Sequence, residues 1–122
     1  MLTGRQVLVV EDVWLIAQEL CTLLQEQHAN IIGPATSLSQ ALKLIDQTNK
    51  IDAAVLNIKL PDGNIFAAAE KLDDRGVPII FHSGYSEAMI EPRFAHCPVW
   101  PKPAAGLPEV LLDLMSKPKH PC

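Results

Sequence analysis

Short apolar segments rich in Val and Ile alternate along this chain with longer segments in which apolar residues recur at helical spacing. This alternation is typical of a parallel β-sheet with helices on both faces, because buried parallel strands read as continuous apolar runs. We therefore expect an α/β fold built on a doubly wound parallel sheet. The strands are expected at residues 6–10, 30–33, 53–57, 77–81 and 98–100.

The segments between these strands predict helices. A turn signal at residues 61–64 precedes one of them, and Gly76 follows it as a glycine C-cap would. Another helix is expected to be short, because Pro92 blocks its extension. The helices are expected at about residues 14–27, 39–46, 65–75, 87–90 and 107–115.

The size and charge of the chain limit its organisation. Its 122 residues, 48% of them hydrophobic, suffice for one domain with a single core. We expect a domain at residues 1–116 and a short tail at 117–122, without an effector domain. The net charge of −4 comes without a basic stripe, so direct nucleic-acid binding is not expected. No apolar run approaches the roughly 20 residues that span a bilayer, and we expect a cytoplasmic protein without membrane contact.

Polar side chains follow four of the expected strands. Glu11 and Asp12 follow the first, Asn57 closes the third, Ser83 follows the fourth and Lys102 the fifth. The carboxyl ends of parallel strands meet at one edge of a sheet, which is where ligands bind. Adjacent carboxylates suit Mg2+, while a hydroxyl and an ammonium suit phosphoryl oxygens. The set predicts a phosphoryl-transfer site, although each member alone is also explained as a helix start, a turn or a surface residue.

Four motifs occur in a fixed order: Val-Val-Glu-Asp, Val-Leu-Asn-Ile-Lys-Leu-Pro-Asp-Gly, Ile-Ile-Phe-His-Ser-Gly-Tyr and Pro-Lys-Pro. Together they resemble the receiver domain of bacterial two-component response regulators, over nearly the whole chain. The resemblance implies a single-domain protein with a flavodoxin-like, five-stranded sheet of strand order 2-1-3-4-5. It also implies a histidine kinase or phosphotransfer protein as partner, and a downstream effector protein.

The resemblance assigns roles to the polar residues. It implies that Mg2+ is held by Glu11, Asp12, residue 57 and the backbone carbonyl of Lys59. Ser83 and Lys102 match the residues that sense the phosphoryl group, and Asn57 stands at the phosphoacceptor position, where the family has an aspartate.

Asn57 changes the chemistry that this site can perform. A neutral carboxamide is a weak nucleophile and does not form the mixed anhydride that a carboxylate forms with phosphorus. Loss of one of three carboxylates also weakens the attraction for Mg2+. We therefore expect no enzyme activity, little or no phosphorylation of the chain itself, weak Mg2+ binding, and a role in a phosphorelay through protein–protein binding.

Other functions remain open at this point. Asn57 can be an introduced substitution in a conventional, Asp-phosphorylated single-domain regulator. A small doubly wound phosphatase or hydrolase would use Glu11 or Asp12 as nucleophile or base, but the chain has no insertion long enough to build a substrate pocket. A flavodoxin-like cofactor binder is disfavoured, because no phosphate-binding loop follows the first strand.

The sequence leaves two candidate surfaces for the partner. One is the helix at residues 14–27, and the other combines the last strand with the two helices that flank it. Val13 and Trp14 are explained equally well by docking and by core packing. In the last strand, Val99 stands where the resemblance implies an inward-swinging aromatic residue, and Trp100 is expected to be an exposed or half-buried packing residue rather than a switch.

Overall fold

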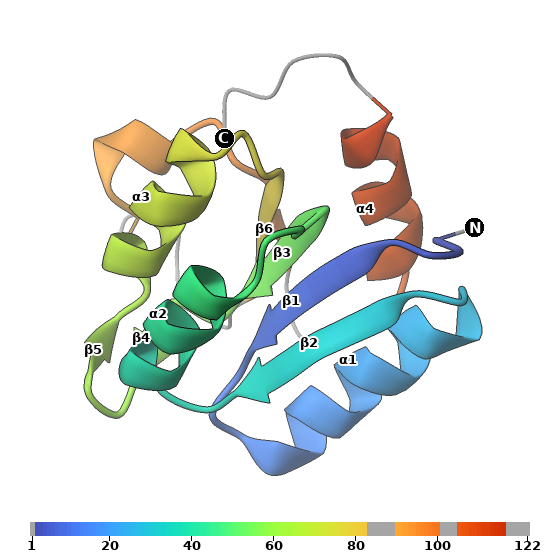
Figure 1. Ribbon diagram of the computed structural model, residues 1–122, viewed down its shortest axis with the longest axis horizontal. Coiled ribbons are helices and arrows are strands. Elements are labelled where there is room, and N and C mark those ends of the chain that lie inside the picture. Colours follow the sequence, from blue (N-terminus) through green and yellow to red (C-terminus); the bar gives the residue numbers. More distant parts are fainter. Residues whose placement is uncertain (1, 83–89, 101–104, 117–122) are drawn as a thin grey trace.

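The structure is a computed structural model that describes residues 2–82, 90–100 and 105–116. Its main sheet is parallel and five-stranded, with the order β2-β1-β3-β6-β7 (Figure 1). The strands are β1 (Gln6–Val10), β2 (Asn30–Ala35), β3 (Ala53–Leu56), β6 (Ile79–His82) and β7 (Val99–Trp100). Counted along the chain, this is the expected order 2-1-3-4-5, and the doubly wound α/β fold is confirmed.

Four α-helices cover the sheet in the described part of the chain. They are α1 (Trp14–Glu26), α2 (Leu38–Gln47), α3 (Phe66–Asp74) and α4 (Leu107–Met115). Each lies within one residue of its expected bounds. The helix expected at residues 87–90 falls almost entirely outside the described residues, as does the tail at 117–122. None of the described helices is long and apolar enough to cross a membrane.

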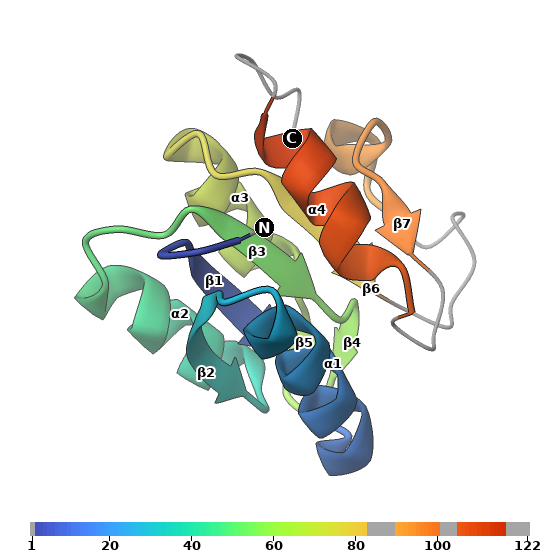
Figure 2. The same cartoon turned by 90° about the vertical axis from the view of Figure 1, so that its right-hand side faces the viewer.

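The helices form a layer on each face of the sheet. Figures 1 and 2 show α2 and α3 on one face and α1 and α4 on the other. Neighbouring residues of β1 point to opposite faces: Leu8 and Val10 pack in the core beneath α2 and α3, while Val7 and Val9 pack beneath α1 and α4. This alternation of fully buried side chains explains why β1 reads as a continuous apolar run.

Strand β2 extends two residues beyond its expected end at Gly33. It continues through Pro34 to Ala35 because β2 is an edge strand, where proline's missing N–H is tolerated. Gly33 itself has φ of 102°, and a Cβ there would lie 2.7 Å from the backbone nitrogen of Ala35 and 2.9 Å from the carbonyl oxygen of Val9. The strand therefore needs glycine at this position.

Strand β6 starts two residues later than the sequence pattern predicts, because the end of α3 uses the preceding backbone. The backbone N–H of Val77 donates to the carbonyl of Leu72 (3.0 Å), and Pro78 has no N–H to donate. Sheet pairing therefore begins at Ile79. Gly76 has φ of 73°, which confirms it as the left-handed glycine that ends α3.

A small hairpin that the sequence did not predict follows β3. Its strands, β4 (Lys59–Leu60) and β5 (Gly63–Asn64), pair antiparallel. The turn between them carries Asp62, whose carboxylate accepts hydrogen bonds from the backbone N–H groups of Leu38 (2.7 Å) and Ser39 (3.0 Å). These two groups lack partners within the first turn of α2, so Asp62 joins the hairpin to that helix. The same hydrogen bonds lower the pKa of Asp62.

Asp62→Asn is expected to flatten the acid dependence of stability. The folded-state pKa of Asp62 lies below its ordinary value of 3.8, so the ionised carboxylate stabilises the fold above about pH 4 and this contribution is lost as the pH falls toward the folded-state pKa. The free energy of unfolding of the unmodified protein should therefore fall more steeply below about pH 4 than that of the variant. Urea unfolding at several pH values measures this, and equal slopes would contradict the role given to Asp62.

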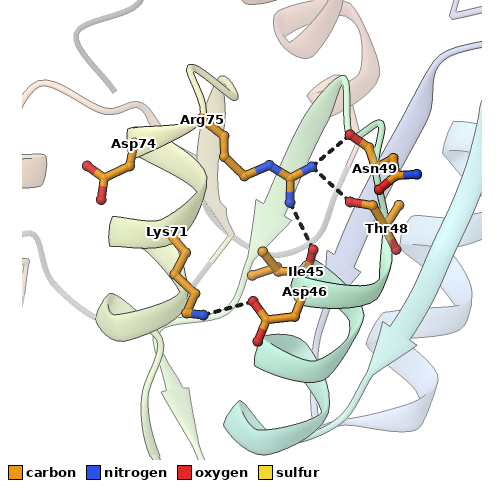
Figure 3. Close-up of a pocket in the computed structure, with 7 residues that line it drawn as sticks. All are labelled: Ile45, Asp46, Thr48, Asn49, Lys71, Asp74 and Arg75. Carbon is orange, nitrogen blue, oxygen red and sulfur yellow. Dashed lines mark hydrogen bonds and ion pairs between the residues drawn. The ribbon is translucent and has the colours of Figure 1, made fainter.

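Arg75 joins the end of α2 to the end of α3. Its guanidinium donates to the carbonyl oxygens of Ile45 (2.8 Å), Thr48 (2.8 Å) and Asn49 (3.0 Å), which end a helix and its following turn (Figure 3). The shallow hollow at this place is completed by Asp46, Lys71 and Asp74. Helices in such a fold run opposite to the strands, so this hollow lies at the edge where the strands begin, away from their carboxyl ends.

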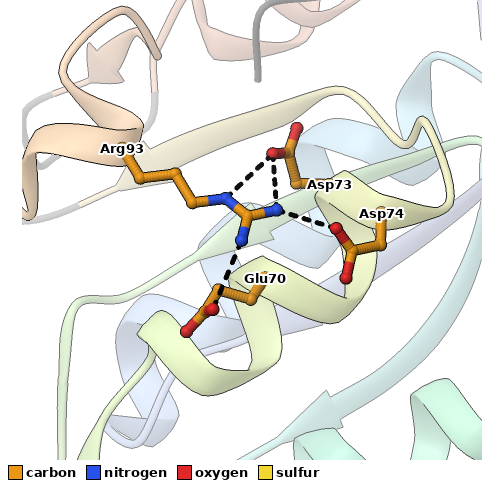
Figure 4. A network of polar contacts seen from close by, with 4 residues as sticks. All are labelled: Glu70, Asp73, Asp74 and Arg93. Atoms are coloured by element: carbon orange, nitrogen blue, oxygen red, sulfur yellow. Dashed lines mark hydrogen bonds and ion pairs between the residues drawn. The ribbon is translucent and has the colours of Figure 1, made fainter.

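A second arginine ties the segment before β7 to α3. Arg93 lies in the 3-10 helix η2 (Pro92–Phe94) and donates to Asp73 (3.0 and 3.2 Å), Asp74 (2.8 Å) and Glu70 (3.3 Å) (Figure 4). The acidic neighbours raise the pKa of Arg93. The contacts are largely exposed, so they orient the segment more than they stabilise it.

Candidate functional site

Glu11 and Asp12 follow β1 directly and lead into α1. Glu11 is fully buried and Asp12 is exposed. Oε2 of Glu11 accepts a hydrogen bond from the backbone N–H of Val13 (3.1 Å), the residue that precedes α1 and that offers no capping side chain of its own. Glu11 thus supports the start of α1, one of the explanations that the sequence left open for it.

Asn57 lies directly after β3 and is only 3% exposed. Its side-chain nitrogen Nδ2 donates to Oδ1 of Asp12 (3.0 Å) and to the carbonyl oxygen of Lys59 (2.8 Å). Both partners can only accept, so the nitrogen rather than the oxygen of the amide must face them. The structure therefore brings together Asp12, Asn57 and Lys59, three of the four residues expected to form the metal site.

The last two strands end at the same edge. His82 of β6 pairs with Trp100 of β7, and these are the last described residues of the two strands. Ser83 and Lys102, which are expected to follow these strands in the site, lie outside the described residues. Trp100 is half-buried, and its Nε1 donates to the carbonyl of Ala105 (3.1 Å), in agreement with the expectation of a half-buried residue.

In the observed orientation of the Asn57 amide, the oxygens around it are not arranged to coordinate a magnesium ion. Mg2+ requires oxygen ligands directed at one point. Here two oxygens expected to face the metal, Oδ1 of Asp12 and the carbonyl oxygen of Lys59, face N–H groups of Asn57 instead. Over residues 2–82, 90–100 and 105–116, no group of three or more His, Cys, Asp or Glu residues is placed to hold a metal.

Residues 7–96 match the family described as the response regulator receiver domain. The chain belongs to this family. It is similar to the phyllosphere-induced regulator PhyR of Methylorubrum extorquens (30% identity over 89 residues, 71% of this chain) and to the transcriptional regulatory protein PdtaR of Mycobacterium tuberculosis (34% over 85 residues, 68% of this chain). The receiver domain spans only 33% and 40% of the lengths of these two relatives.

A solved structure supports the same assignment. The structure of SdrG from Sphingomonas melonis Fr1 is 30% identical to this receiver domain, with a TM-score of 0.78, and the alignment covers 91% of this chain and 95% of that one. The fold and the motif order therefore agree with the family match, and the chain is a receiver domain of the type that serves two-component signalling.

Exposed apolar side chains follow this site in the sequence. They belong to Val13, Trp14 and Leu15, which are 45%, 70% and 66% exposed and come directly after Asp12. Among the described residues, these are the large hydrophobic side chains that face solvent. The core-packing interpretation of Val13 and Trp14 is therefore wrong, because α1 buries Ala17, Leu20, Cys21 and Leu24 instead.

Proposed function

We propose that this receiver domain acts in a two-component phosphorelay by binding other proteins, with little or no phosphorylation of its own. The observation that carries this proposal is the environment of Asn57, whose amide nitrogen is engaged by Asp12 and Lys59 at the phosphoacceptor position. An amide at this position offers no anionic oxygen for attack on phosphorus. The domain is then a binding module and not an enzyme.

The remaining site residues keep reduced roles in this proposal. Glu11, Asp12, the carbonyl of Lys59 and the side-chain oxygen of Asn57 bind Mg2+ weakly, because the ion must first displace the two hydrogen bonds of the amide. Ser83 and Lys102 are proposed to contact a phosphoryl group presented by a partner.

The exposed apolar side chains of Val13, Trp14 and Leu15 favour the α1 surface for docking of the partner. They lie at the start of α1 and follow the exposed Asp12 directly in the sequence. An exposed aromatic residue with a polar rim is typical of the centre of a protein interface. We place a histidine kinase or phosphotransfer protein here, and a downstream effector protein is the second partner of the pathway.

Phosphoryl labelling tests whether residue 57 accepts a phosphoryl group. The unmodified protein and Asn57→Asp are incubated with acetyl phosphate and Mg2+, and their intact masses are followed. We expect no added mass on the unmodified protein and one phosphoryl group on the aspartate variant, since the variant regains an anionic nucleophile. Asn30→Asp, which places the same change at an exposed position, should stay unlabelled. Labelling of the unmodified protein would contradict the proposal.

The acidic pair supports a second candidate, a conventional regulator in which Asn57 is an introduced substitution. Glu11 is buried and Asp12 contacts residue 57, as they would around an aspartate. The codon for residue 57 in the native gene distinguishes the two candidates. If neither protein gains mass, the second candidate loses its support from this pocket, and the domain acts only by phosphorylation-independent binding.

A further inference from the structure

We propose that the side-chain amide of Asn57 takes the place of a divalent cation in holding together this edge of the sheet. Its Nδ2 atom can donate two hydrogen bonds and donates both. One goes to Oδ1 of Asp12 (3.0 Å), and the other goes to the carbonyl oxygen of Lys59 (2.8 Å). The amide thereby joins the segment after β1 to strand β4. The inference concerns the isolated chain and does not depend on which partner it binds.

The orientation of the amide is set by its neighbours. Rotating it by half a turn would place Oδ1 against Asp12 and Lys59, so that three acceptors would face one another without a donor. In the observed orientation, Oδ1 is buried and has no hydrogen-bond partner among the described residues. One unpartnered acceptor costs less free energy than three acceptors that face one another, one of them charged. The orientation in which Nδ2 faces Asp12 and Lys59 is therefore favoured.

The charge balance explains why an aspartate would need a cation here and why Asn57 does not. With an aspartate at residue 57, a carboxylate oxygen would replace Nδ2 and face the carboxylate of Asp12 and the carbonyl of Lys59. The buried carboxyl group of Glu11, which precedes Asp12 in the sequence, would add to this group of oxygens. The repulsion within such a cluster of oxygens destabilises it, and a cation or a proton relieves that repulsion. Stabilisation by a metal is therefore expected to depend on an acid at residue 57.

Thermal unfolding in EDTA and in excess Mg2+ tests this inference. The unmodified protein should gain little Tm from Mg2+, because its Mg2+ binding is weak. Asn57→Asp should have a lower Tm than the unmodified protein in EDTA and should regain most of the difference with Mg2+. The control Asn30→Asp, at an exposed position, should show no Mg2+ dependence. An increase of Tm with Mg2+ in the unmodified protein as large as in Asn57→Asp would overturn the inference.

A second measurement observes the Asn57 amide of the unmodified protein directly. The two side-chain N–H protons of Asn57 give a pair of NMR signals in a 15N-labelled sample, and hydrogen bonding with burial should slow their exchange with water relative to those of the exposed Asn30. These signals should keep their positions at the Mg2+ concentrations that stabilise Asn57→Asp. Rapid exchange, or a shift of this pair on addition of Mg2+ at the concentrations that stabilise Asn57→Asp, would show that the amide does not hold the pocket.

Discussion

Trp14→Ala is expected to weaken binding of the receiver domain to the histidine kinase or phosphotransfer protein proposed as its partner by about 30-fold, equivalent to about 2 kcal/mol. The indole is 70% exposed in the isolated chain and lies between two further exposed apolar residues, Val13 and Leu15. Covering such a side chain removes a large apolar area from water, which is why tryptophan is frequent among the residues that dominate interface energies. Isothermal titration calorimetry against each candidate kinase or phosphotransfer protein measures the change.

A matched substitution on the other candidate surface makes this result specific. Met115→Ala truncates a half-buried side chain at the end of α4, on the surface that the sequence left as the alternative, and should leave the affinity unchanged. Because Trp14 is exposed, its substitution should alter the free energy of unfolding by only about 0.5 kcal/mol. Normal binding by Trp14→Ala together with weakened binding by Met115→Ala would move the docking site to α4.

Phe94→Ala is expected to lower the free energy of unfolding by about 3–5 kcal/mol, the largest effect on stability that we anticipate. Phe94 is fully buried, stacked on Phe66 (ring centroids 5.7 Å apart) and edge-on to Phe81 (6.0 Å). Truncation would leave a cavity between these two rings, and part of the structure around it cannot collapse because Phe66 and Phe81 also contact each other (5.8 Å).

Phe94→Leu separates the aromatic contacts from the volume of the side chain. It keeps most of the apolar volume in the core and leaves a smaller cavity, so it should cost clearly less stability than Phe94→Ala. Urea unfolding of the two variants under the same conditions measures both values. If Phe94→Ala lost no more stability than Phe94→Leu, the three-ring cluster would not be a principal element of this core.

The fold was predictable because each level of the sequence points to the same structure. Strand β1 and helix α4 begin and end where the apolar pattern places them. The apolar pattern failed where contacts with other elements set the start of a strand. Val77 is apolar enough for a strand, but its backbone N–H donates to a carbonyl at the end of α3. The hairpin of β4 and β5 was missed because strands of two residues carry too little pattern to detect.

The candidate site was predictable in its residues but not in its hydrogen bonds. Residue order alone placed Asp12 and Asn57 at neighbouring strand ends, and the contact between them confirms that placement. No sequence signal indicates that the amide nitrogen would face inward, because its two acceptors come from separate segments. The same holds for Asp62, which contacts the start of α2 across a sequence separation of 23 and 24 residues.

The hydrogen bonds of Asn57 also bear on timing. A phosphorylated carboxylate is a mixed anhydride that water slowly cleaves, so the rate of this hydrolysis limits the lifetime of the phosphorylated state. A pocket held by amide hydrogen bonds contains no bond that decays in this way. If the proposed function holds, the fraction of the partner bound by the domain depends only on the two protein concentrations and their dissociation constant. The duration of its signal would then be governed by synthesis and degradation of the polypeptide.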